Sequence, residues 1–252
     1  MLNDNKDKAE LKEDAEIEEM MKAGLHFGHK KTKRHPKMEP YIYGVRNGVS
    51  VIDVSKTKQK LQEALDFIFG SISQGKVLLL VGTKVQVKGI VKEIGEECEI
   101  PYINERWLGG TITNFDIIKK RIDHLKDLEK KKEEGDLEKY TKKERIKIDR
   151  EIKSLKIKFE GLKPLSKIPD IIFVLDTVHD DLAVKEARDK KIKIIGIVDT
   201  NANPEIIDYP IPANDDAFSS VKYILEKLKE TVLKSKAEFQ KKSNIQEPAD
   251  NQ

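Results

Sequence analysis

The sequence is poor in cysteine and in aromatic residues, and each shortage narrows the class of protein. Cys98 is the only cysteine among 252 residues, so an intrachain disulfide framework is excluded and a reducing compartment is expected. Aromatic residues make up 6% of the chain and charged residues 37%, whereas charged residues are about a quarter of ordinary globular domains. Much of the chain should therefore form surface that faces water or a polyanion.

Glycine-rich phosphate loops are also lacking. The apolar run VLLLVG (77–82) is followed by Thr83-Lys84-Val85-Gln86, with no further glycine to let the backbone approach a pyrophosphate. The chain contains no G-x-x-x-x-G-K-[ST] run, and no nucleophile stands beside a base. We therefore predict that the protein is not an enzyme and that it uses no nicotinamide, nucleotide or other cofactor.

Long apolar runs are absent as well. No run approaches the roughly 20 residues that cross a bilayer, and the acidic N-terminal segment resembles neither a secretory signal nor an Arg-rich transit peptide. We therefore predict a soluble, cytoplasmic protein without a membrane partner. Polar composition at the two ends predicts a disordered acidic tail at residues 1–16 and a disordered polar tail at residues 234–252.

An α/β pattern fills the chain between the tails, and we assign residues 17–114 and 161–233 to this domain. The continuous apolar runs VLLLVG, IPYIN, DIIFVLD and IKIIGIVD predict a parallel sheet with helices on both faces. Apolar spacing predicts helices near residues 56–73, 84–98, 180–190 and 214–233. Arg46-Asn47-Gly48 lies between two β-type runs and predicts a type I′ hairpin.

An insertion at residues 115–160 interrupts this pattern. Residues 116–160 include 16 basic and 12 acidic residues. Two apolar stripes at helical spacing, Phe115, Ile118, Ile122 and Leu125 followed by Ile148, Ile152, Leu155 and Phe159, are typical of a coiled-coil seam. Gly135 separates the stripes, and Thr141 with Glu144 forms a capping box that restarts a helix. We predict an antiparallel helical hairpin, which is either a solvated spacer or an arm that reaches a second partner.

Acidic side chains follow two predicted strands, where parallel sheets bind ligands. Asp176 and His179 follow the first strand and Asp199 follows the second. These three residues are candidate metal ligands. Because their spacing is not distinctive, helix and loop capping is the favoured interpretation, and no metal is predicted.

Two segments are candidates for binding nucleic acid. The run from His29 to Lys37 concentrates cations around Pro36, which predicts a basic loop that neutralises phosphates; a solvated loop or a site for an acidic protein are the alternatives. Arg106-Trp107 beside Gly109-Gly110 offers stacking and a forked phosphate contact, although a core Trp fits equally well. The predicted RNA-binding set is His26, His29, Lys30, Lys31, Lys33, Arg34, Lys37, Arg46, Lys84, Arg106 and Trp107.

Several motifs resemble those of one known family. They are GLHFGH (24–29), HPKM (35–38), RNGVSVIDVSKT (46–57), LLVGTK (79–84), INERWLGGTITNF (103–115), TKKE (141–144), PDIIFVLD (169–176), IVDTNANP (197–204) and IPANDDA (211–217). In order and length they resemble the bacterial-type family of small-subunit ribosomal protein two, over residues 17 to 230.

The resemblance implies a flavodoxin-like or Rossmann-like sheet with an inserted coiled-coil hairpin. It also implies a structural role in the small ribosomal subunit, where the protein would contact rRNA and neighbouring ribosomal proteins. Among those neighbours is protein one, which helps to recruit mRNA. No catalytic role follows from the resemblance.

Overall fold

The computed structural model describes residues 15–245. Among these residues, one compact unit comprises 15–76, 174–179 and 194–245, and a second comprises 77–173 and 180–193. The predicted acidic tail lies outside the described residues except for 15 and 16, which are helical together with residues 17–22. The predicted polar tail lies outside them only from residue 246. The predicted domain boundaries differ from these two units and stay a prediction.

The larger sheet has five strands in the order β5-β4-β6-β7-β8. Its members are β4 (Leu78–Val81), β5 (Tyr102–Ile103), β6 (Ile171–Val174), β7 (Lys193–Val198) and β8 (Tyr209–Pro212). Strands β4 and β5 pair in parallel, as do β7 and β8. Every residue of β4 and β6 is buried, as expected when helices cover both faces of a parallel sheet. The predicted α/β class is confirmed.

Strand β8 is missing from the sequence-based assignment because Pro210 and Pro212 interrupt its apolar run. Ala213 N–H, just after the strand, donates to the Val198 carbonyl of β7 at 3.3 Å. Residues at alternate positions before it, Ile211 and Tyr209, therefore also direct their N–H groups toward β7. The two prolines occupy the positions whose N–H groups would point away, which is why an edge strand accepts them.

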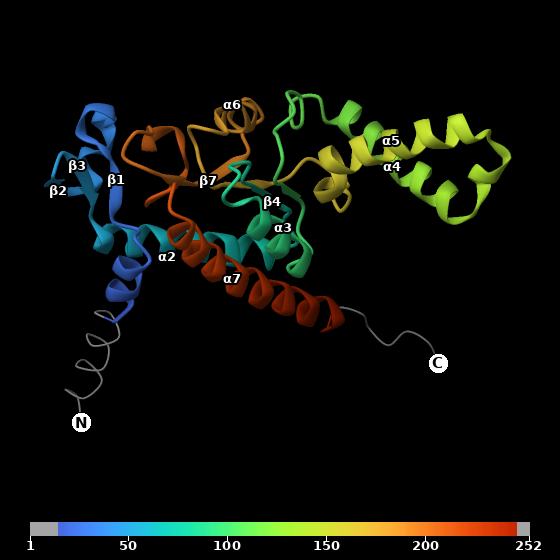
Figure 1. The fold of residues 1–252 in the computed structure, drawn as a ribbon. Coiled ribbons are helices and arrows are strands. Elements are labelled where there is room, and N and C mark those ends of the chain that lie inside the picture. Colours follow the sequence, from blue (N-terminus) through green and yellow to red (C-terminus); the bar gives the residue numbers. More distant parts are fainter. Residues whose placement is uncertain (1–14, 246–252) are drawn as a thin grey trace. The chain divides into compact units, whose positions relative to one another are not determined.

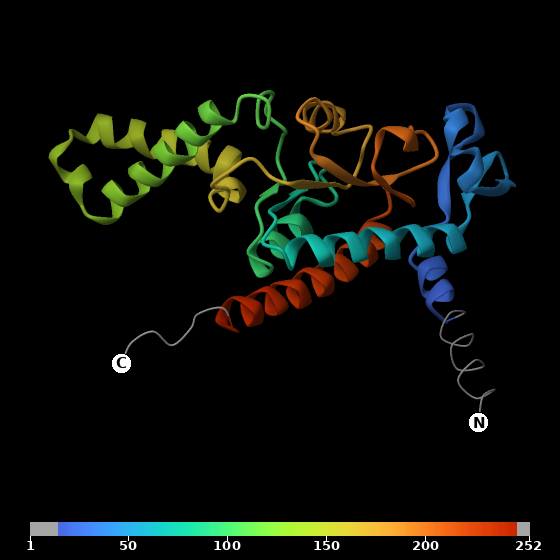
Figure 2. The same cartoon turned by 180° about the vertical axis from the view of Figure 1, so that it is seen from behind.

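The four helices predicted for the α/β domain are present, but their ends differ from the prediction. They are α2 (Val54–Ile72), α3 (Lys88–Glu97), α6 (Asp181–Asp189) and α7 (Phe218–Ile245). Helix α2 begins two residues before the predicted start because Asp53 caps it, accepting a hydrogen bond from Ser55 N–H at 3.1 Å. In both Figure 1 and Figure 2, α2 lies beside α7, and the two helices pack together.

Helix α7 corrects two predictions. It begins at Phe218 rather than 214 because Asn214 Oδ1 accepts hydrogen bonds from the N–H groups of Asp216 and Ala217 and closes a turn there. It continues to Ile245, so residues 234–245 are helical and not a disordered tail. Leu228, Val232 and Ser235 are fully buried, which shows that packing along this face carries the helix beyond residue 233.

A second, three-stranded antiparallel sheet has the order β1-β3-β2, formed by β1 (Phe27–Lys30), β2 (Ile42–Arg46) and β3 (Val49–Ile52). Asn47 and Gly48 connect β2 to β3 with φ angles of 50° and 77°. Positive φ at both central residues is the property of a type I′ turn, so the predicted hairpin is confirmed.

The insertion forms the predicted helical hairpin, labelled in Figure 1, from α4 (Phe115–Glu133) and α5 (Lys142–Phe159). The two helices pack together, with Ile122 and Leu125 of α4 and Ile152 of α5 buried at 5% exposure or less. Gly135 interrupts the chain with φ of 77°. The Thr141 N–H and hydroxyl then both donate to Glu144 Oε2, at 2.9 and 2.8 Å, and begin α5.

No helix within residues 15–245 has the length and apolar character that crossing a membrane requires.

Candidate nucleic-acid interface

Lys30, Lys31 and Lys33 lie on an ordered segment and not on the predicted loop. Strand β1 ends at Lys30, and the 3₁₀ helix η1 covers Lys31–Lys33. The loop prediction is wrong because backbone hydrogen bonds fix both ends of the segment: Lys31 N–H donates to Gly48 carbonyl at 2.9 Å, and His35 N–H to Thr200 carbonyl at 2.8 Å. All three lysines are exposed, and none pairs with an acidic side chain in the described part of the chain.

Arg46 extends this group of cations along the small sheet. Val49 of β3 is the register partner of Lys30 on one side and of Arg46 on the other. Directly paired residues point to the same face of a sheet, so Lys30 and Arg46 belong to one row. Their Cα atoms should lie about 10 Å apart, twice the usual strand spacing. Like the lysines, Arg46 is exposed and has no acidic partner among residues 15–245.

The other two cations of the basic segment are engaged in ion pairs. Arg34 Nη2 lies 2.5 Å from Glu39 Oε2, and Lys37 Nζ lies 2.7 Å from Glu205 Oε1. Both acids are exposed, at 65% and 58% of their side chains, so water screens these pairs and each is worth little. Either cation would have to leave its carboxylate to meet a phosphate.

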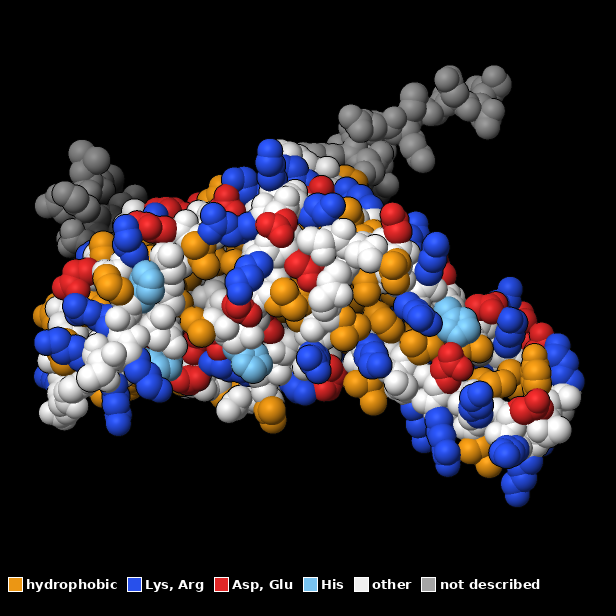
Figure 3. Space-filling view, turned by 90° about the horizontal axis from the view of Figure 1, so that it is seen from above, with side chains coloured by type: hydrophobic (Ala, Val, Ile, Leu, Met, Phe, Trp, Pro, Cys, Tyr) orange, Lys and Arg blue, Asp and Glu red, His pale blue; other side chains and the backbone are white. Residues whose placement is uncertain are grey.

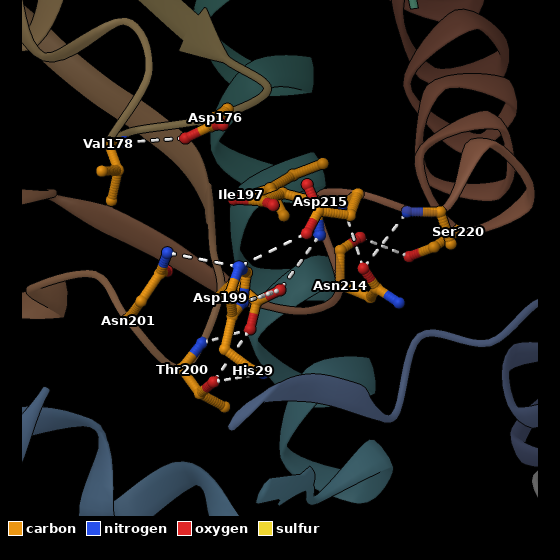
Figure 4. A network of polar contacts seen from close by, with 12 residues as sticks. His29, Asp176, Val178, Ile197, Asp199, Thr200, Asn201, Asn214, Asp215 and Ser220 are labelled. Atoms are coloured by element: carbon orange, nitrogen blue, oxygen red, sulfur yellow. Dashed lines mark hydrogen bonds and ion pairs between the residues drawn. The ribbon is translucent and has the colours of Figure 1, made fainter. Parts of the chain in front are cut away.

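His29 is held inside its unit instead of facing solvent. Figure 4 shows its ring beside Asp199, and the Nδ1 to Asp199 Oδ2 distance is 3.2 Å. Nε2 lies 3.3 Å from Asp216 Oδ2. The hydrogen bond to Asp199, together with the surrounding negative charge and against the effect of burial, raises the pKa of His29. A histidine bound to two aspartates is poorly placed to bind a phosphate. His29 therefore stabilises the contact between β1 and the residues that follow β7 and β8.

His26 differs from His29 in its surroundings. Burial lowers its pKa, and its ring packs against Phe27 with 4.0 Å between the ring centroids. A neutral, half-buried ring contributes no charge to a phosphate contact.

The strand-end acids are occupied with local backbone and side-chain contacts. Asp176 Oδ1 accepts hydrogen bonds from the N–H groups of Val178 and His179, both at 2.8 Å. Asp199 Oδ1 accepts from the N–H and hydroxyl of Thr200, at 2.5 and 3.0 Å. These are the contacts of capping and turn residues. Across residues 15–245, no three His, Cys, Asp or Glu side chains are arranged to hold a metal ion.

Trp107 is a core residue, so its assignment to RNA stacking is wrong. Its side chain is 6% exposed, and its Nε1–H donates to Glu186 Oε1 at 3.0 Å. Arg106 beside it is exposed and Lys84 is half-buried, and both stay candidates. A buried indole with its N–H satisfied cannot stack on a base without unfolding its surroundings.

Glu186 holds the segment from Trp107 to Thr113 in place through hydrogen bonds. Its carboxylate accepts hydrogen bonds from the N–H groups of Gly110, Ile112 and Thr113, at 2.8, 3.0 and 3.0 Å. The hydroxyl of Thr113 donates as well, at 2.9 Å. Sequence reasoning misses Glu186 because a glutamate in a charged helix normally faces water.

Known proteins are similar to this sequence along most of its length. The model of the family described as "Ribosomal protein S2" matches residues 20–235. This chain belongs to the ribosomal protein S2 family. The small ribosomal subunit protein uS2 of Dictyoglomus thermophilum is 43% identical over 230 residues, which cover 91% of this chain and 94% of that protein. The protein uS2c of Rhodomonas salina is 44% identical over 216 residues, covering 86% and 89%.

Family membership confirms the resemblance inferred from the motifs. An S2-family protein is a structural constituent of the small ribosomal subunit in translation, and not an enzyme. Its surroundings are therefore rRNA and other ribosomal proteins. The exposed cations described above are the residues that suit the RNA part of those surroundings.

Proposed function

We propose that Lys30, Lys31, Lys33 and Arg46 form the rRNA anchor of this small-subunit protein. One observation carries the proposal: these four cations are exposed on ordered backbone, in β1, η1 and β2, and have no acidic partner within residues 15–245. An ordered segment loses little entropy on binding, so a phosphate contact costs less than it would on a loop. Arg34 and Lys37 are secondary contacts, available after their carboxylates release them.

The anchor predicts a change in the salt dependence of RNA binding. Replacing Lys30, Lys31 and Lys33 with Ala should reduce the slope of log K against log salt by about 2 to 3, because each phosphate contact contributes about 0.7 to 0.9. The slope is measured with the full chain and purified small-subunit rRNA.

A matched control removes three lysines that lie elsewhere. Lys92, Lys222 and Lys234 are exposed and pair with acids on their own helices. Their replacement with Ala removes the same net charge and should leave the slope nearly unchanged. If both triple variants showed the same slope of log K against log salt, net charge alone would set the affinity for rRNA. The proposal that Lys30, Lys31 and Lys33 contact phosphates would then be wrong.

We further propose that this chain contacts protein one, the mRNA-recruiting protein of the small subunit. An open groove of about 700 Å³ on the small sheet supports a protein partner. Phe27 and Tyr43 on its walls are 53% and 82% exposed. Exposed aromatic side chains on a concave apolar surface are typical of protein interfaces and unusual on a surface that stays in water.

The groove predicts the effect of removing its aromatic side chains. Replacing Phe27 and Tyr43 with Ala should weaken binding of purified protein one at least tenfold, because aromatic side chains are frequent hot spots. Calorimetry after ribonuclease treatment measures the protein contact alone. Val85→Ala, which truncates a side chain 80% exposed in the other unit, is the control. Unchanged affinity of the double variant would exclude this groove as the contact.

A further inference from the structure

The outward face of α5 is a continuous row of cations. Successive residues of a helix turn by 100°, so the positions opposite the buried Ile152 and Phe159 are those of Lys143 and Arg150. Lys147 and Lys158 flank these two on one side and Lys142 and Lys153 on the other, and all six side chains are exposed. From Lys142 to Lys158 the row extends about 24 Å at 1.5 Å per residue. Figure 3 shows Lys and Arg side chains on the hairpin at the right of the view, together with acidic and hydrophobic side chains.

The acidic residues of α5 do not neutralise this row. The helix has three acids, and each has another contact: Glu144 binds Thr141, Asp149 lies 2.5 Å from Lys132, and Glu151 lies 3.1 Å from His124. None of the six cations lies within ion-pair distance of an acidic side chain in the part of the chain that the structure describes. Lys132 lowers the pKa of Asp149, and Lys153 adds a smaller effect in the same direction. The row therefore keeps most of its positive charge.

Helix α4 of the same hairpin has a different surface. Its lysines near the end pair along the helix or across the hairpin, as Lys130 does with Glu134, Lys131 with Asp127 and Lys132 with Asp149. Asp116, Asp123 and Asp127 lie among its cations. A solvated spacer would be expected to mix charges on both helices, as α4 does. The unmixed face of α5 needs a different explanation.

The apolar content of the row indicates which partner it fits. Ile146 and Ile157 are 44% and 63% exposed, and they are eleven residues apart, so they form no contiguous patch. A protein interface normally has a contiguous apolar, water-excluding centre, and two separate isoleucines among the cations do not form one. An extended row of cations instead suits the regular phosphate spacing of a nucleic-acid backbone.

We propose that the outer face of α5, formed by Lys142, Lys143, Lys147, Arg150, Lys153 and Lys158, is a second binding surface for the rRNA backbone. The inference rests on the proposed role in the small subunit, but it does not depend on the anchor at residues 30–46. Phosphates are the recognised groups, so binding through this face should depend on salt and little on base sequence.

The test replaces four cations of the row in the full-length chain. Lys143, Lys147, Arg150 and Lys153 are changed together to Ala, which favours helix, and the salt dependence of binding to purified small-subunit rRNA is measured. The slope should fall by about 3. A second variant with Lys at all four positions, which differs from the original only by Arg150→Lys, should keep the original slope. Circular dichroism and thermal unfolding check that both variants remain folded.

The control removes the same charge from the other helix. Lys120, Lys126, Lys130 and Lys131 of α4 are changed to Ala, and the slope should change by less than 1. If the two quadruple variants lower the slope equally, the effect is one of net charge and the proposal is overturned. It is also overturned if the α5 variant binds rRNA normally but fails to enter assembling small subunits, since the partner would then be an acidic protein.

The two proposals can fail separately. If the triple variant at residues 30, 31 and 33 leaves the slope unchanged while the α5 variant lowers it, the anchor is lost and the α5 surface stands. If only the triple variant lowers the slope, the anchor stands and α5 is a spacer.

Discussion

Replacing Glu186 with Gln should destabilise the protein by about 3 to 5 kcal/mol, the range for breaking a buried charged network. The side chain is 5% exposed, and its carboxylate receives five hydrogen bonds from Trp107 and from the segment 110–113. A Gln side chain has the same shape, but its NH₂ group is a donor and would face other donors. Urea unfolding of the full chain measures the loss.

A control from the same helix separates this network from a general charge effect. Asp189 is exposed at the end of α6, and Asp189→Asn should change the free energy of unfolding by less than about 0.5 kcal/mol. A similar small loss for Glu186→Gln would mean that the five hydrogen bonds contribute no net stability.

The pH dependence of stability follows from the same residue. Burial raises the pKa of Glu186, but the hydrogen bonds from Thr113, Trp107, Gly110 and Ile112 outweigh it and leave the pKa lowered. A group with a lowered pKa in the folded state stabilises the protein above the unfolded pKa, about 4.3 for Glu, and loses that contribution as pH falls through the folded value. Acid unfolding of the Glu186→Gln variant should therefore lack part of the pH dependence of the original protein below about pH 4.3.

Gly28→Ala should destabilise the protein by about 1 to 3 kcal/mol through overpacking. A Cβ atom at this position would collide with the side chain of Thr200 and lie 3.0 Å from the carbonyl of Ser50. Thr200 is fully buried, and its hydroxyl accepts from His29 N–H at 2.8 Å, so it cannot move aside without breaking that contact. Thermal and urea unfolding report the loss.

A neighbouring glycine provides the control for this prediction. Gly44 in β2 has open space around the corresponding Cβ position, and Gly44→Ala should be nearly neutral. Thr200→Ser removes the methyl group that collides and should recover part of the stability in the double variant. A Gly28→Ala protein as stable as the original would show that β1 shifts freely, and would weaken the view of the anchor as an ordered segment.

The sequence predicts those features that depend on local patterns. The type I′ turn at Asn47-Gly48 and the capping box at Thr141 and Glu144 are each fixed by residues within four positions of one another. The buried strands and the hairpin seam follow from apolar periodicity, which needs no knowledge of the partner element.

Other features depend on residues that are distant in the chain. Glu186 meets its donors 73 to 79 positions away, and His29 meets Asp199 across 170 positions. No local pattern distinguishes such a glutamate from one that faces water. The assignment of Trp107 to RNA stacking is wrong for the same reason. Its indole donates to Glu186 of α6, which is distant in the sequence. The sequence identifies Lys30, Lys31, Lys33 and Arg46 as cations of the surface. It does not predict that their backbone is ordered in β1, η1 and β2.

Strand β8 has a consequence for self-association. An exposed sheet edge attracts strands from other chains because its unpaired N–H groups are donors for a new ladder. Pro210 and Pro212 occupy the two positions of β8 whose N–H groups would face outward, and proline has none to offer. The edge of the large sheet is thereby protected against templated aggregation, including during the interval between synthesis of the chain and its burial in a ribosome.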